Sequence, residues 1–186
     1  MRVTTTPTIR RPQHLPLLVL GLAVAVSAIV VIWLLAGGGS GTTVKQNGGP
    51  TIVSQAELER FAGTLDYPVY WAGPKAGFSY ELTAASGRVW VRYLPAGVKA
   101  GDPRPSFLVV GTYRQPRSLA GLRRAASQPD GVSERIPDGG LLVYNSQRPT
   151  SVYFAYPGVK YQVEVYAPSA ETARSLVAAG KATPLR

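Results

Sequence analysis

The longest hydrophobic stretch of the chain lies near its N-terminus. Leu17 to Ala36 reads LLVLGLAVAVSAIVVIWLLA, which is 20 residues without a charge. As an α-helix this stretch is about 30 Å long, which matches the hydrocarbon thickness of a bilayer. Arg2, Arg10 and Arg11 precede it without an acidic residue, so the positive-inside rule places the N-terminus in the cytoplasm. The pattern predicts a single-pass helix that contacts the lipid bilayer, with the rest of the chain outside the cell membrane.

A cleaved signal peptide is the alternative interpretation of the same stretch. The apolar region of a signal peptide is normally about 7–15 residues long and is followed by a cleavage site with small residues. The stretch here is longer, although Ala36 and Gly38 could supply the small residues. We therefore expect an uncleaved signal-anchor.

A composition change after the hydrophobic stretch defines the remaining parts of the chain. Residues 37–53 read GGGSGTTVKQNGGPTIV, a Gly-rich sequence typical of a flexible linker. Residues 54–186 are numerous enough to form a hydrophobic core of their own. The predicted organisation is a cytoplasmic tail (1–16), a transmembrane helix (17–36), the linker (37–53) and an extracytoplasmic domain (54–186).

Helical signals occur at the start, middle and end of this domain. Ser54 and Glu57 form the S-x-x-E pattern of a capping box before a helical apolar face. Ser118 is the predicted N-cap of a second, short helix. Ser169 is the predicted N-cap of a third helix, and Gly180 is its predicted C-terminal stop.

Between the helices the apolar residues follow the two-residue period of strands. Four such segments lie between Tyr67 and Tyr113, and four more between Val132 and Tyr166, separated by Gly- and Pro-containing turns. The connections are too short for parallel crossovers, so the fold class is α+β, with a mainly antiparallel sheet of about six to eight strands and three helices. V-W-V-R-Y-L-P-A-G at 89–97 resembles V-Y-F-A-Y-P-G at 152–158, which suggests an internal duplication. The alternative is that two amphipathic hairpins share these residues by composition alone.

Composition excludes most catalytic chemistry. The chain has no cysteine and one histidine, His14, which lies outside the predicted domain. Ser-His-Asp and Cys-His catalysis and zinc sites of the usual ligands are therefore not expected there. We expect no catalytic residue, no metal site and no cofactor.

One carboxylate pair keeps an enzymatic alternative open. Glu81 and Glu164 both lie on predicted strands, on faces opposite the apolar residues. If they faced one another at roughly 5–10 Å, they could act on glycans as the acids of a glycosidase do. The other interpretation is that both are ordinary solvated residues.

Net charge points to anionic partners. The chain carries 20 Lys and Arg against 10 Asp and Glu, and residues 54–186 carry 16 of the former and all 10 of the latter. Nucleic acid is not an expected partner outside the cell, whereas anionic lipid headgroups and acidic wall polymers are. A predicted basic patch surrounds the second helix, unless these side chains are simply solvated; its members are Arg114, Arg117, Arg123 and Arg124.

A second candidate site lies on one predicted strand. In R-V-W-V-R-Y-L, Val89 and Val91 have the parity of the core, so Arg88, Trp90 and Arg92 are expected on the opposite face. An exposed Trp between two guanidinium groups suggests a binding residue for a ligand or partner. Alternatively, Trp90 is covered from within by a stacked Arg or a helix.

Three segments carry a family resemblance, namely Pro68–Gly73, Val89–Pro95 and Ser151–Tyr166. Together with the anchor, the linker, the Tyr-rich domain and the excess of Arg over Lys, they resemble uncharacterised single-pass membrane-anchored envelope proteins of high-GC actinobacteria. The outline of helix, sheet and helix is also similar to small exported lipoprotein domains with a Mog1-like sandwich, although no lipobox cysteine is present. The resemblance implies an envelope location and no particular activity.

The sequence therefore predicts a membrane-anchored extracytoplasmic domain that is a non-catalytic binding or scaffolding module at the cell envelope. Its expected partner is an envelope protein or an anionic wall polymer. The alternatives are a carboxylate-dependent enzyme that acts on glycans, and a structural membrane subunit without a ligand of its own.

Overall fold

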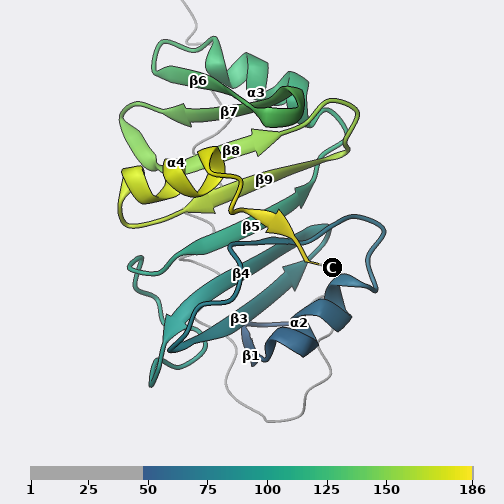
Figure 1. Ribbon diagram of the computed structural model, residues 1–186, viewed down its shortest axis with the longest axis vertical. Coiled ribbons are helices and arrows are strands. Elements are labelled where there is room, and N and C mark those ends of the chain that lie inside the picture. The colour runs from purple at the N-terminus through teal and green to yellow at the C-terminus, as the bar shows by residue number, and fades with distance from the viewer. Residues whose placement is uncertain (1–47, 186) are drawn as a thin grey trace, which may run out of the picture.

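The domain is built on one large antiparallel sheet. The computed structural model describes residues 48–185, and the predicted cytoplasmic tail, transmembrane helix and first part of the linker lie outside them. The sheet has eight strands in the order β1-β3-β4-β5-β9-β8-β7-β6, and every neighbouring pair is antiparallel (Figure 1). The strands are β1 (Thr51–Val53), β3 (Phe78–Ala85), β4 (Arg88–Pro95), β5 (Val109–Arg114), β6 (Gly131–Ile136), β7 (Gly140–Asn145), β8 (Arg148–Ala155) and β9 (Tyr161–Tyr166).

Three α-helices complete the α+β architecture of the described region, as the sequence predicts: α2 (Gln55–Ala62), α3 (Ser118–Ala126) and α4 (Ala170–Ala178). The capping box of α2 is confirmed, because the Glu57 amide donates to Ser54 Oγ at 3.3 Å and the Ser54 amide donates to Glu57 Oε2 at 2.7 Å. The Ser169 cap of α4 is confirmed as well, and Gly180 follows its end with a φ of 63°. The N-cap of α3 is different: Arg117 occupies it, and the Ser118 hydroxyl instead donates to the Val159 carbonyl at 3.1 Å.

Two strand assignments differ from the sequence prediction. The last three residues of the predicted linker form β1, because Val53 is buried and Thr51–Val53 pairs with β3. The first predicted strand, near Tyr70, does not join the large sheet. Tyr70–Trp71 (β2) pairs with Thr183–Pro184 (β10) in a separate two-stranded sheet. This segment lies across the large sheet, where the Tyr70 amide donates to Thr112 Oγ1 at 2.9 Å.

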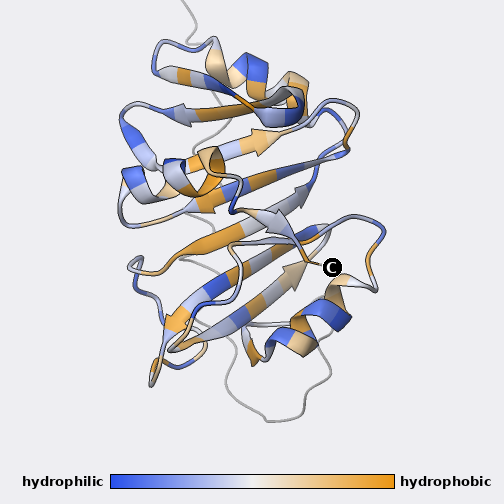
Figure 2. Ribbon diagram, in the orientation of Figure 1, coloured by the Kyte–Doolittle hydropathy of each residue, from blue (hydrophilic) through white to orange (hydrophobic). Residues whose placement is uncertain are grey.

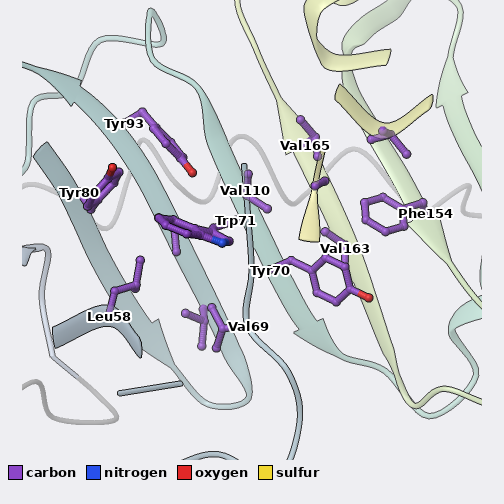
Figure 3. Close-up of a cluster of buried hydrophobic side chains, with 14 of the residues drawn as sticks. Leu58, Val69, Tyr70, Trp71, Tyr80, Tyr93, Val110, Phe154, Val163 and Val165 are labelled. Carbon is purple, nitrogen blue, oxygen red and sulfur yellow. The ribbon is translucent and has the colours of Figure 1, made fainter. Parts of the chain in front are cut away.

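The two faces of the large sheet differ in chemistry. The core face carries the alternate apolar residues that the sequence pattern selects, such as Leu82, Val91 and Val110. Helices α2 and α4 and the β2–β10 pair cover it (Figure 1). Figure 3 shows how Trp71 and Tyr70 from β2 lie against residues of β3, β4, β5 and β9. The other side, called the opposite face below, carries Glu81, Arg92 and Glu164 among other residues, and hydrophilic segments interrupt the hydrophobic ones along β4 and β9 (Figure 2).

Two elements cover the opposite face. Helix α3 packs Leu122 onto Val143, Tyr153 and Ala155 of β7 and β8. At the other half of the sheet, the loop 96–108 contacts Arg92. Polar residues therefore become buried on this side of the sheet, which positions the candidate sites.

The strands repeat, whereas the helices do not. β3-β4-β5 and β7-β8-β9 are two meanders that run from the outside of the sheet to its centre and meet at the β5–β9 pair. An axis perpendicular to the sheet would relate them, but it would also place α2 and α3 on the same face. In the structure α2 lies on the core face and α3 on the opposite face. The likeness between the two halves is therefore confined to the strands.

Candidate functional site

Glu81 and Arg92 form a buried ion pair on the opposite face. Their strands place them directly across from one another, and Arg92 Nη1 lies 3.1 Å from Glu81 Oε1. The Gly101 amide donates to the second carboxylate oxygen at 2.7 Å. Burial raises the pKa of the Glu81 carboxyl above its ordinary value, and this outweighs the Gly101 amide and the Arg92 guanidinium, which lower it.

Arg92 also holds the loop 96–108 onto the sheet. Its Nη2 donates to the Asp102 carbonyl at 2.6 Å and to the Arg104 carbonyl at 3.3 Å, and its guanidinium lies 4.9 Å from the centre of the Phe107 ring. Arg92 is only 5% exposed. The expectation of an exposed stripe through Arg88, Trp90 and Arg92 is therefore wrong for Arg92, because Glu81 pairs with it inside the protein.

Glu164 lies in a second buried cluster, in which hydroxyl groups surround its carboxylate. Ser151 Oγ donates to Oε1 at 2.8 Å and the Tyr153 hydroxyl donates to the same oxygen at 3.0 Å. The Tyr113 hydroxyl donates to Oε2. Burial and the nearby Glu164 carboxylate raise the pKa of both tyrosines, so they remain hydrogen-bond donors. The cluster satisfies the carboxylate without a cation and ties β5, β8 and β9 together.

Trp90 is partly covered from within by the same cluster. Its indole N–H donates to the Tyr113 hydroxyl at 3.0 Å, and the two rings meet edge to face with centroids 5.9 Å apart. Gly111 makes room for this contact, because a Cβ there would lie 2.9 Å from the Tyr113 hydroxyl and 3.1 Å from Trp90 Cδ1. Trp90 is half-buried, so its role as a binding residue stays a prediction.

Glu81 and Glu164 do not face one another. They lie on the same face, but β4 and β5 separate their strands. Three strand spacings of about 4.8 Å place the two backbones about 14 Å apart, beyond the roughly 5–10 Å of a glycosidase pair. Each carboxylate is also occupied by its own internal partners. The geometry does not favour the predicted catalytic pair.

A hollow of about 200 Å³ lies between the end of α2 and the β3–β4 turn. Its buried residues are apolar, and its exposed residues are polar or charged. The lining consists of Phe61, Leu65, Asp66, Tyr67, Ala84, Ser86, Gly87, Arg88, Val89 and Arg114. The hollow therefore combines an apolar interior with a charged rim, which is the arrangement that binding sites for small molecules commonly have.

The charges at the hollow are not balanced. Arg114 Nη2 lies 2.8 Å from Asp66 Oδ2, so these two side chains pair with one another. Arg88 is exposed and forms no ion pair within residues 48–185. Burial, together with the negative charge of Asp66, raises the pKa of Tyr67, which keeps its hydroxyl protonated at the rim.

The hollow joins residues that the sequence analysis places in two different candidate sites. Arg88 belongs to the predicted stripe and Arg114 to the predicted basic patch. Arg88 lies across from Tyr113 in the β4–β5 register, so Arg114 is its next neighbour. Pairing the two strand segments antiparallel would have revealed this proximity, whereas the contribution of α2 required the tertiary structure.

The remaining arginines of the predicted basic patch lie on α3. Arg117 is the N-cap residue, and Arg123 and Arg124 lie in the last turn, where positive charge interacts favourably with the helix dipole. All three are exposed, and α3 contains no acidic residue. Arg114 differs from them, because it pairs with Asp66 at the hollow.

Other functional signals are absent from the described part of the chain. Residues 48–185 contain no group of three His, Cys, Asp or Glu side chains that could hold a metal ion, and no helix long and apolar enough to cross a membrane. Comparison with protein-family models, with curated proteins and with solved structures gave no match to this chain.

Proposed function

We propose that this chain is a single-pass membrane protein whose extracytoplasmic domain is a non-catalytic binding module for an anionic wall polymer. Residues 17–36 supply the anchor and the Gly-rich segment after them supplies a flexible tether. A tethered domain explores only the space near the membrane, so its partners are components of the cell envelope.

The observation that carries this proposal is the surface charge of the domain. Residues 54–185 contain 15 Lys and Arg and 10 Asp and Glu. The core holds one of the cations, Arg92, and two of the acids, Glu81 and Glu164. The remainder is 14 cationic and 8 anionic side chains, so burial makes the surface more positive than the composition alone suggests. Such a surface attracts polyanions.

The arrangement of the acidic residues supports binding over catalysis. Both strand carboxylates are held by internal hydrogen bonds, and they lie too far apart to act on one glycosidic bond. The enzymatic alternative therefore has no carboxylate pair in its favour. An envelope protein as partner, and a structural subunit without a ligand, are the outcomes that compete with polymer binding in the test below.

Polymer binding can be measured with the full-length protein in phosphatidylcholine nanodiscs, using poly(glycerol phosphate) as the probe. We expect binding that weakens steeply with salt. Replacing Arg117, Arg123 and Arg124 by Gln should lower the affinity at least tenfold. The matched control replaces three scattered exposed cations, Lys99, Arg135 and Lys181, by Gln and should lower it less. No binding by the wild-type protein would contradict the proposal, and equal losses in the two variants would remove α3 from it.

A further inference from the structure

We propose that the hollow between α2 and the β3–β4 turn binds a single acidic group, a carboxylate or a phosphate, that carries a small apolar substituent. The proposal names the ligand chemistry of the binding module and so rests on the proposed function. It follows from the charge, the lining and the shape of the hollow.

The charge of the hollow selects an anion. Three charged side chains line it, and two of them, Arg114 and Asp66, neutralise one another at 2.8 Å. Arg88 remains without an ion-pair partner among the residues that the structure describes. A guanidinium offers several N–H donors in one plane, which match the oxygen atoms of a carboxylate or a phosphate.

The lining of the hollow selects an apolar substituent. Phe61, Ala84 and Val89 are buried and face the space with their apolar surface, at exposures of 5%, 4% and 1%. Since one water occupies about 30 Å³, the hollow of about 200 Å³ has room for about six or seven waters. That space suits a group of the size of one ring and is too small for a polymer segment.

The rim of the hollow is fixed before a ligand arrives. Ser86 and Gly87 form the tight β3–β4 turn with φ values of 39° and 77°. The Gly87 carbonyl accepts the Arg114 amide at 2.8 Å, so the turn is bonded to β5. A preformed site loses little conformational entropy when it binds, which allows even a small anion to be held.

The experiment compares three probes of similar shape, namely benzoate, phenyl phosphate and benzyl alcohol. Each is titrated into the full-length protein in phosphatidylcholine nanodiscs and followed by saturation-transfer NMR, with empty nanodiscs subtracted. We expect at least one of the two anions to bind, and benzyl alcohol to bind at least tenfold more weakly. The anion that binds more tightly identifies whether the natural group is a carboxylate or a phosphate.

Three variants test the roles of the individual residues. Arg88→Gln should weaken anion binding at least tenfold, whereas Arg123→Gln, on the distant α3, should leave it unchanged. Asp66→Asn should tighten anion binding severalfold, because it releases Arg114 from its ion pair. This gain cannot arise from damage to the fold.

Several outcomes would overturn the proposal. They are equal binding of benzyl alcohol and the anions, unchanged binding by Arg88→Gln, and weaker binding by Asp66→Asn. Failure of both anions to bind, while poly(glycerol phosphate) still binds, would overturn the hollow as a site and leave the proposed function standing.

Discussion

The guanidinium of Arg92 lies 3.1 Å from the carboxylate of Glu81 inside the protein, with side-chain exposures of 7% and 0%. The pair connects β3 with β4, and the two carbonyls that Arg92 contacts connect both strands with the loop 96–108. Two polar residues therefore take the place of a hydrophobic contact between this loop and the sheet.

Removing one partner of this pair should destabilise the domain strongly. In Arg92→Met the Glu81 carboxylate loses its cation while it stays buried, which costs about 3–5 kcal/mol of unfolding free energy. The double variant Glu81→Met, Arg92→Met leaves no unpaired charge and should lose less than the sum of the single losses. Urea unfolding of all four proteins measures this coupling. Strictly additive losses would show that the pair does not act as a unit.

The same carboxylate predicts a pH dependence of stability. Because burial raises the pKa of Glu81 above its ordinary value of 4.5, the folded protein holds this proton to a higher pH than the unfolded chain does. The unfolding free energy contributed by Glu81 should therefore fall as the pH rises from about 4.5 through the raised pKa. The difference between wild type and Glu81→Gln isolates this contribution. Parallel stability profiles in the two proteins would contradict the prediction.

Two glycines should respond to alanine in opposite directions. A Cβ at Gly111 would lie 2.9 Å from the Tyr113 hydroxyl and 3.1 Å from Trp90, so Gly111→Ala should displace both rings and cost about 1–3 kcal/mol. Gly121 lies within α3 and has nothing within 4 Å of the corresponding position. Gly121→Ala should stabilise the domain by up to about 1 kcal/mol through helix propensity. Thermal unfolding of both variants tests whether the Gly111 site is as tightly packed as the structure indicates.

The alternation of apolar residues predicted most of the core. Positions such as Leu82, Val91 and Val163 have one parity on their strands, and the structure buries them on one face. The central place of β5 is also confirmed, because a strand that is apolar on both faces must be covered on both sides. These are local consequences of the two-residue period of a strand.

The predictions that failed depend on contacts between residues distant in sequence. The strand near Tyr70 has the composition of a sheet strand, but a hydrogen bond to Thr112 and pairing with β10 place it above the sheet. Ser118 has the preference of an N-cap, but its hydroxyl finds the Val159 carbonyl across the fold. Parity alone could not show that Arg92 is buried, because the loop that covers it lies outside the strand pattern.

The candidate site was only partly visible in the sequence. Arg88 and Arg114 could be selected as unbalanced charges, and their antiparallel pairing explains why they meet. The apolar wall from Phe61 could not be predicted, since it depends on where α2 packs against the sheet. The hydroxyl cluster around Glu164 was missed for the same reason: its donors come from β5 and β8, far from Glu164 in the chain.

The domain should fold without its anchor. A fragment that begins at residue 48 keeps all of the described strands and helices and both faces of the sheet. We expect it to be soluble and to unfold in one cooperative transition, with no change of the melting temperature when EDTA is added. Differential scanning calorimetry with and without the chelator measures both properties. Aggregation of the fragment, or a melting temperature that falls with EDTA, would contradict a self-sufficient, metal-independent domain.

Export of the C-terminal domain is the most direct test of the account. Alkaline phosphatase, which is active only outside the cytoplasm, is fused after Arg186 of the full chain, and a parallel fusion carries a reporter that is active only in the cytoplasm. A fusion that lacks residues 17–36 serves as the control. Because of the uncharged stretch and the arginines before it, we predict an active phosphatase in the membrane fraction, an inactive cytoplasmic reporter, and no phosphatase activity in the control. An inactive phosphatase together with an active cytoplasmic reporter in the full-length fusions would place the domain inside the cell and contradict its proposed role in the envelope.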